Sequence, residues 1–188
     1  MSHRKLQVSE MHRMSVDEFV GSEKLGLIIV LDNVRSQHNI GAVFRSADAF
    51  GLEGVLLCGI CCTPPNQEIH KTALGAELSV AWQHFDDTRQ AIAFLRERGY
   101  LIYSVEQTEN SQTLDSFEVA SDEKIAVVLG HEVFGVSQEV VDMSDGVIEI
   151  PQYGTKHSLN VSVAAGIVMY QISEKMRRYA SNNEKICH

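Results

Sequence analysis

Three stretches of this sequence combine side chains that could do chemistry with small residues that would leave room for a ligand. The first is "NIGAVFRSADAFG" (residues 39–51), in which Asn39 and Arg45 lie on one expected helix. A guanidinium can hold a phosphate in a fixed geometry, so Arg45 is a candidate for binding an anionic group. An exposed Arg on a helix is also ordinary, and by itself it assigns no function.

The second stretch is "VLGHEVFGVS" (residues 128–137), in which Glu132 stands between Gly130 and Gly135. Glycines on both sides let the backbone approach a ligand closely, because no Cβ stands in the way. The stretch lacks the Gly-Lys-Ser/Thr of a Walker loop and the glycine spacing of a dinucleotide fingerprint. A simple turn that carries an exposed acid explains it equally well.

The third stretch is "IPQYGTKHSLN" (residues 150–160), which places Ser158 and Asn160 at the start of an apolar run. The run predicts a long helix from about Ser158 to Tyr179. A buried helix face needs Leu, Val and Ala, but it needs no hydroxyl or amide at its mouth. Because a helix N-terminus attracts electron-rich groups, the polar start indicates a ligand pocket.

The elements around these stretches indicate an α/β fold. Short, continuous apolar runs predict strands at residues 25–34, 53–59, 100–105, 124–130 and 146–150. Amphipathic patterns predict helices between them, including one that Asn39 caps and one over residues 86–99. Strands that are apolar throughout and alternate with helices are typical of a mostly parallel sheet flanked by helices.

In such sheets ligands bind beyond the carboxyl ends of the strands. The polar residues of this chain follow the first, third, fourth and fifth expected strands. We therefore expect four loops to converge on one rim of the sheet: residues 33–45, 106–108, 130–135 and 151–160.

Composition limits the class of protein. The chain has 188 residues, of which 44% are hydrophobic and 22% charged, as in soluble globular domains. No run approaches the roughly 20 apolar residues of a membrane helix. The N-terminus has no apolar core of signal-peptide type, so we expect a cytoplasmic protein.

The cysteines and the net charge argue against two further classes. Cys58, Cys61 and Cys62 follow an apolar run and Cys187 stands apart, without a partner pair at zinc-finger spacing. We interpret the cluster as small apolar residues near a strand end, with neither a metal nor a disulfide framework. The formal net charge of -9 argues against bulk electrostatic attachment to nucleic acid, although a local basic patch stays open.

Together the three stretches resemble the three motifs of the SpoU (TrmH-like) family of RNA ribose 2′-O-methyltransferases, in the SPOUT superfamily. The matching segments are "NIGAVFRSADAFG", "VLGHEVFGV" and "IEIPQYGTKHSLNVSVAAGI", in the family's order and spacing, within residues 25–179. The resemblance implies a SPOUT fold with a C-terminal deep trefoil knot. It also implies S-adenosylmethionine as cofactor, tRNA or rRNA as substrate, and a homodimer joined through the knot region, with no metal and no membrane.

The resemblance also divides the chain and assigns residues. Residues 1–24 would be a partly helical extension, residues 25–180 the methyltransferase domain and residues 181–188 a flexible tail. The implied catalytic residues are Asn39, Arg45, Glu132, Ser158 and Asn160. The implied cofactor-binding residues are Gln107, Gly130, Ile150, Ser158 and Leu159. Arg45 could act as the base or, staying protonated, hold a phosphate and stabilise negative charge on the oxygen.

Two features of the chain depart from the pattern or leave it incomplete. Gln152 stands where many members carry Met, and an acidic chain must still capture RNA. We expect the RNA-binding surface to be a basic stripe formed across a dimer from Arg35, Arg45, Lys71, Lys156 and the terminal Arg and Lys residues. Two other hypotheses are a SPOUT-fold RNA-binding or assembly protein without catalysis, and a generic α/β nucleotide-binding enzyme. The five catalytic residue types disfavour the first, and the missing phosphate-loop fingerprints disfavour the second.

Overall fold

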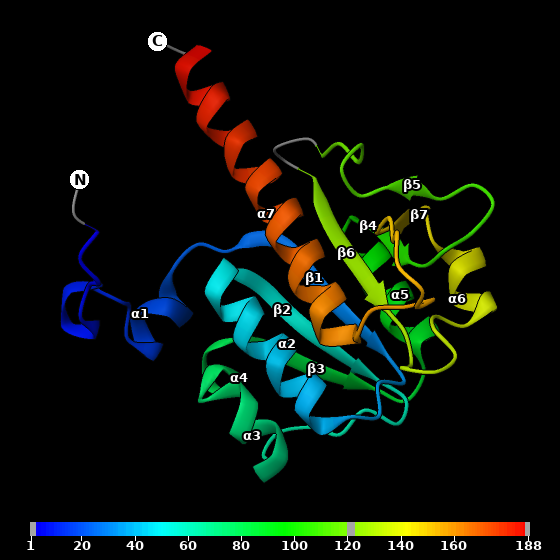
Figure 1. Ribbon diagram of the computed structural model, residues 1–188, viewed down its shortest axis with the longest axis horizontal. Helices are drawn as coiled ribbons and strands as arrows, with labels where there is room; N and C mark the ends of the chain where they lie inside the picture. Colours follow the sequence, from blue (N-terminus) through cyan, green and yellow to red (C-terminus); the bar gives the residue numbers. More distant parts are fainter. Residues whose placement is uncertain (1–2, 120–122, 187–188) are drawn as a thin grey trace.

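The computed structural model describes residues 3–119 and 123–186, which form one sheet covered by helices on both faces (Figure 1). The sheet has seven strands in the order β3-β2-β1-β6-β4-β7-β5, and every pairing between them is parallel. The strands are β1 (Leu25–Asp32), β2 (Leu52–Cys58), β3 (Ala81–Phe85), β4 (Tyr100–Val105), β5 (Gln112–Thr113), β6 (Lys124–Leu129) and β7 (Gly146–Glu149). The predicted α/β class with a mostly parallel sheet is confirmed.

The helices divide between the two faces of the sheet. They are α1 (Val16–Gly21), α2 (Gln37–Phe50), α3 (Gln67–Ala73), α4 (Ala76–Ser79), α5 (Thr88–Arg96), α6 (Gln138–Met143) and α7 (Val161–Ile186). The first hydrophobic cluster joins the sheet to α2, α3 and α7, and the second joins it to α5 and α6. Within the described ranges, no helix is long and apolar enough to cross a membrane.

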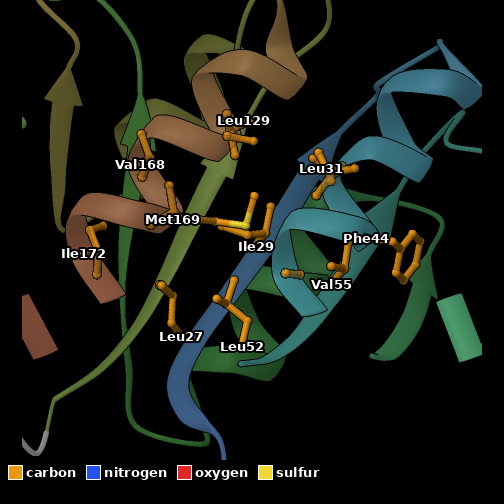
Figure 2. Packing of buried hydrophobic residues seen from close by; sticks show 14 of the residues in the cluster. Leu27, Ile29, Leu31, Phe44, Leu52, Val55, Leu129, Val168, Met169 and Ile172 are labelled. Carbon is orange, nitrogen blue, oxygen red and sulfur yellow. The ribbon is translucent and has the colours of Figure 1, made fainter. Parts of the chain in front are cut away.

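Strand β1 shows why the central strands read as unbroken apolar runs. Leu27, Ile29 and Leu31 pack into the first cluster, while Ile28 and Val30 pack into the second. Because successive side chains point to opposite faces, a strand covered on both sides needs an apolar residue at every position. Figure 2 shows Met169 of α7 lying across Ile29, which ties the last helix to the middle of the sheet.

Strand β7 lies between β4 and β5 although it follows both of them in the chain. Val105 of β4 pairs with Ile148, and Ile148 pairs with Gln112 of β5. Residues 106–111 therefore lead from one side of β7 to the other. This connection also carries two of the residues that line the site described below.

Some boundaries and elements differ from the sequence prediction. The five predicted strands correspond to β1, β2, β4, β6 and β7, whereas β3 and β5 were not predicted. Helix α2 starts at Gln37 and its cap is Ser36, whose side chain accepts a hydrogen bond from the Asn39 backbone, so Asn39 is not the cap. Helix α7 starts at Val161, and it continues to Ile186 through most of the expected tail.

Candidate active-site cleft

A cleft of about 330 Å³ opens at the carboxyl ends of β4, β6 and β7. Three of the four predicted loops line it, at residues 105–107, 129–135 and 149–164. The fourth loop, after β1, joins through side-chain hydrogen bonds. The structure thus brings together all the residues expected to contact a cofactor, namely Gln107, Gly130, Ile150, Ser158 and Leu159.

The loop after β6 folds back on itself and forms one wall of the cleft. His131 and Gly135 exchange two backbone hydrogen bonds, of 3.0 and 2.8 Å. At Gly130 an added Cβ would lie 2.0 Å from the carbonyl carbon of Gly135 and 2.1 Å from the Val136 nitrogen. Since these are backbone atoms of the same turn, only glycine fits at position 130.

Glu132 ties this loop to the start of α2. Its carboxylate accepts hydrogen bonds from the backbone of Arg35 (3.1 Å), the backbone of Ser36 (2.9 Å) and the Asn39 side chain (3.1 Å). Partial burial raises the pKa of Glu132, but these hydrogen bonds and one from its own backbone together outweigh it. The pKa therefore lies below its ordinary value, and the group is a carboxylate at neutral pH.

Asn160 extends the same network to the C-terminal helix. Its Nδ2 donates to Oδ1 of Asn39 at 3.2 Å, while its Oδ1 accepts from the backbone of Ser162 at 2.9 Å. Asn160 thus caps α7 and also reaches across to α2, 121 residues earlier in the chain. The polar residues before α7 serve the cap and the site, and they precede the helix instead of forming its first turn.

One more contact closes the cleft from the side of β4. The Gln107 side chain donates to the backbone carbonyl of His157 at 2.9 Å. This bond holds the segment before α7 against the loop after β4. Ser158 and Leu159, which follow directly, face the cleft.

Comparison with known proteins explains this arrangement. The sequence profile of the SpoU rRNA Methylase family matches residues 26–170. The chain belongs to the SpoU methylase family. It is 32% identical to a Thermus thermophilus protein named tRNA (guanosine(18)-2′-O)-methyltransferase, over 87% of this chain and 82% of that one. Family membership removes the alternative of an unrelated α/β nucleotide-binding enzyme.

Solved structures agree with the family assignment. The A. aeolicus TrmH/SpoU tRNA modifying enzyme superposes with a TM-score of 0.77 at 28% identity, over 88% of this chain and 82% of that one. The fold is also shared with the SpoU methyltransferase AviRb from Streptomyces viridochromogenes in complex with AdoMet, with a TM-score of 0.73 at 20% identity, over 84% and 60% of the two chains.

Arg45 is the one implied catalytic residue of this SpoU member that lies away from the cleft and its network. It is exposed on α2, six residues after Asn39. Because successive residues of an α-helix are about 100° apart around its axis, the Arg45 side chain points about 240° away from that of Asn39. It lines a separate groove, which is also formed by residues 11–16 and by Arg177. In one chain, the guanidinium therefore faces a different surface from the cleft.

The three expected RNA-binding residues lie on different segments. Arg35 is exposed in the loop after β1, and Lys156 is exposed in the segment before α7. Lys71 is exposed on α3, where its ammonium group contacts Glu68 at 2.5 Å. Among the described residues of a single chain, no contact links Arg35, Lys71 and Lys156 into a continuous stripe.

Two acidic residues near the site received no role from the sequence, although Glu106 belongs to one of the expected rim loops (residues 106–108). Asp32 is 2% exposed at the end of β1 and accepts hydrogen bonds from Thr88 (2.5 Å) and the Ser137 backbone (3.2 Å), which fixes the far end of the loop after β6. Glu106 accepts from the backbone of Gln107 and of Val136, and it lines the cleft. An acid at the end of an otherwise apolar strand was the available signal for both.

The thiols near the site are structural. Burial raises the pKa of Cys58 to about 12 and that of Cys61 to about 11, so both are protonated at neutral pH. Cys58 is the last residue of β2, as the sequence indicated. Cys187 lies outside the described residues.

Proposed function

We propose that this chain transfers the methyl group of S-adenosylmethionine to a ribose 2′-hydroxyl of tRNA or rRNA. The observation that carries the proposal is the network of Glu132, Asn39 and Asn160 beside a cleft, in a member of the SpoU family. A relative named as a tRNA 2′-O-methyltransferase and a structural neighbour that holds AdoMet support it.

The cleft suits the cofactor in size and lining. Its volume of about 330 Å³ is in the range of small-molecule sites, which is roughly 300–1,000 Å³. Val105, Leu129 and Val161 offer apolar contacts to a base. We assign the cofactor contacts to Gln107, Gly130, Ile150, Ser158 and Leu159.

The residues around the cleft would align the reactants. S-adenosylmethionine carries an already activated methyl group, so the reaction needs alignment and a place for the hydroxyl proton, and no metal. In this scheme Glu132 fixes the loop after β6 to α2, and Asn39 and Asn160 fix α2 to α7. Ser158, beside the cleft, would contact the ribose or the cofactor.

Arg45 would act from the side of the RNA. Because it lies outside the cleft of its own chain, it cannot hold the cofactor there. A cationic Arg45 would hold a backbone phosphate and stabilise negative charge that develops on the ribose oxygen. Arg35, Lys71 and Lys156 would contact the RNA further out.

We further propose that the enzyme is a cytoplasmic homodimer and that its C-terminal segment is knotted. Insertion of β7 between β4 and β5 supports the knot, because the chain must lead past residues 106–111 to reach α7. The dimer surface would be the exposed face of α7, where Val163, Ile167 and Tyr170 remain 51%, 39% and 53% exposed. Exposed apolar side chains on one helix face are typical of an interface.

Methyl incorporation tests the proposal directly. Purified enzyme with radiolabelled S-adenosylmethionine should label tRNA or rRNA, and the product should resist alkaline cleavage at one position. Mapping 2′-O-methyl groups in total RNA with and without the gene would name the nucleotide. If the protein binds both the cofactor and RNA but transfers no methyl group, the alternative of an inactive RNA-binding member is correct.

A further inference from the structure

The cleft has an unusual charge for an enzyme that handles RNA. Its described lining residues include the three acids Glu106, Glu132 and Glu149, and neither Lys nor Arg. A cleft of this charge repels phosphate and attracts cations. S-adenosylmethionine has a positively charged sulfonium, whereas S-adenosylhomocysteine, the product that remains after transfer, has a neutral thioether. The two ligands otherwise share their adenosine and their amino-acid group.

The three acids of the cleft differ in the groups from which they accept hydrogen bonds. Glu132 already accepts from the backbone of Arg35 and Ser36 and from a third donor, the Asn39 side chain. Glu149 is at the β5 side of the sheet, where its Oε2 accepts from the Ser111 hydroxyl at 2.7 Å. Both acids therefore have an evident task in holding the chain together.

Glu106 differs in its position and its partners. It follows the last residue of β4, and β4 lies between β6 and β7, the other two strands that end at the cleft. Among the described residues, its hydrogen-bond donors are the backbone groups of Gln107 (3.1 Å) and Val136 (3.3 Å). A carboxylate offers about four acceptor directions, so each oxygen keeps one for a ligand.

The loop after β6 holds the Glu106 carboxylate in place. At Gly135, which has a φ of 68°, an added Cβ would lie 2.0 Å from Oε1 of Glu106. The carboxylate thus lies directly against the backbone of the cleft wall. A charge fixed in this way interacts with a ligand without the entropy loss of an unrestrained side chain.

We propose that Glu106 recognises the positive charge of the cofactor, so that the cleft holds S-adenosylmethionine in preference to S-adenosylhomocysteine. This inference depends on the proposed function. Loss of the sulfonium charge on methyl transfer removes the attraction to Glu106, and the product then leaves more easily. Glu106 is a specificity residue of the cofactor site, and it takes no part in moving the hydroxyl proton.

The test is calorimetry of the full chain with three ligands: S-adenosylmethionine, S-adenosylhomocysteine, and sinefungin, which carries an amine in place of the sulfonium. In Glu106→Gln, affinity for the two cationic ligands should fall about tenfold, while that for S-adenosylhomocysteine changes less than about twofold. Unchanged binding of the neutral ligand also shows that the cleft is intact. Glu149→Gln is the matched control, with less than about threefold change for each ligand.

Other outcomes overturn the assignment. If Glu106→Gln lowers the affinity for all three ligands equally, Glu106 only stabilises the loop. If Glu149→Gln shows the same selectivity, the effect comes from the charge of the whole cleft. If Glu106→Gln does not fold, the wild-type protein still decides, because S-adenosylmethionine should bind more tightly than S-adenosylhomocysteine, and equal or reversed affinities reject the proposal. Wild-type protein that binds neither ligand refutes the proposed function, whereas active protein that binds the two ligands equally refutes only this inference.

Discussion

Substitution of Gly130 by Ala should damage the cleft far more than its size suggests. The new Cβ would lie 2.0 Å from the carbonyl carbon of Gly135, whereas real Cβ contacts are essentially never shorter than 3.0 Å, so the turn must move by about 1 Å or more. That movement would break the two backbone hydrogen bonds between His131 and Gly135. Overpacking costs about 1–3 kcal/mol and each lost hydrogen bond about 0.5–1.5 kcal/mol, which gives a loss of roughly 2–6 kcal/mol in stability.

The assay compares urea unfolding and cofactor binding of Gly130→Ala with those of Gly154→Ala. Gly154 lies in the segment before α7, an added Cβ there meets nothing within 4 Å, and its φ is outside the left-handed region. The control should unfold within about 0.5 kcal/mol of the wild type and bind the cofactor normally. If Gly130→Ala matches this control in both measurements, the packing of the turn around position 130 is not as described.

Three other predictions address the site and the assembly. Arg45→Ala should lower the rate of methyl transfer by at least about 100-fold. The cofactor dissociation constant should change less than about twofold, because Arg45 lies outside the cleft. Near-normal turnover would reject the proposed role of Arg45. Glu132→Gln should lower stability by about 1–2 kcal/mol at neutral pH. Because the pKa of Glu132 is lowered on folding, this difference should shrink as the pH falls below its ordinary value of 4.5, and a pH-independent difference would contradict the network. Ile167→Glu should shift sedimentation from dimer to monomer, since a dimer would bury an unpaired carboxylate, and a stable variant dimer would place the interface elsewhere.

The sequence predicted the central strands because they are buried on both faces and must be apolar throughout. It did not predict β3, whose residues Ala81, Trp82 and Gln83 are exposed at the sheet edge. That strand is defined by backbone pairing with β2, including Ala81 opposite Gly54, and such pairing leaves little trace in side-chain pattern. The two-residue strand β5 is too short to show a period.

The sequence predicted which residues lie at the candidate site better than it predicted the hydrogen bonds that join them. Gln107, Gly130 and Leu159 meet at the cleft because they follow parallel strands that end at the same edge. The sequence could not show that Asn160 caps α7 and also bonds Asn39, since the two amides are far apart in the chain. It also could not show that Arg45 lies outside the cleft, because the position of α2 relative to the loops after β4, β6 and β7 is set by the packing of the whole sheet.

The position of β7 between β4 and β5 has a consequence for synthesis on the ribosome. Until Gly146–Glu149 have emerged, β5 has no neighbour and the gap beside β4 stays open. The wall formed by residues 149–164 therefore comes last, and the nascent protein gains its ligand pocket only after these residues have emerged. A protein interrupted before that point would carry two of its three motifs and bind no cofactor.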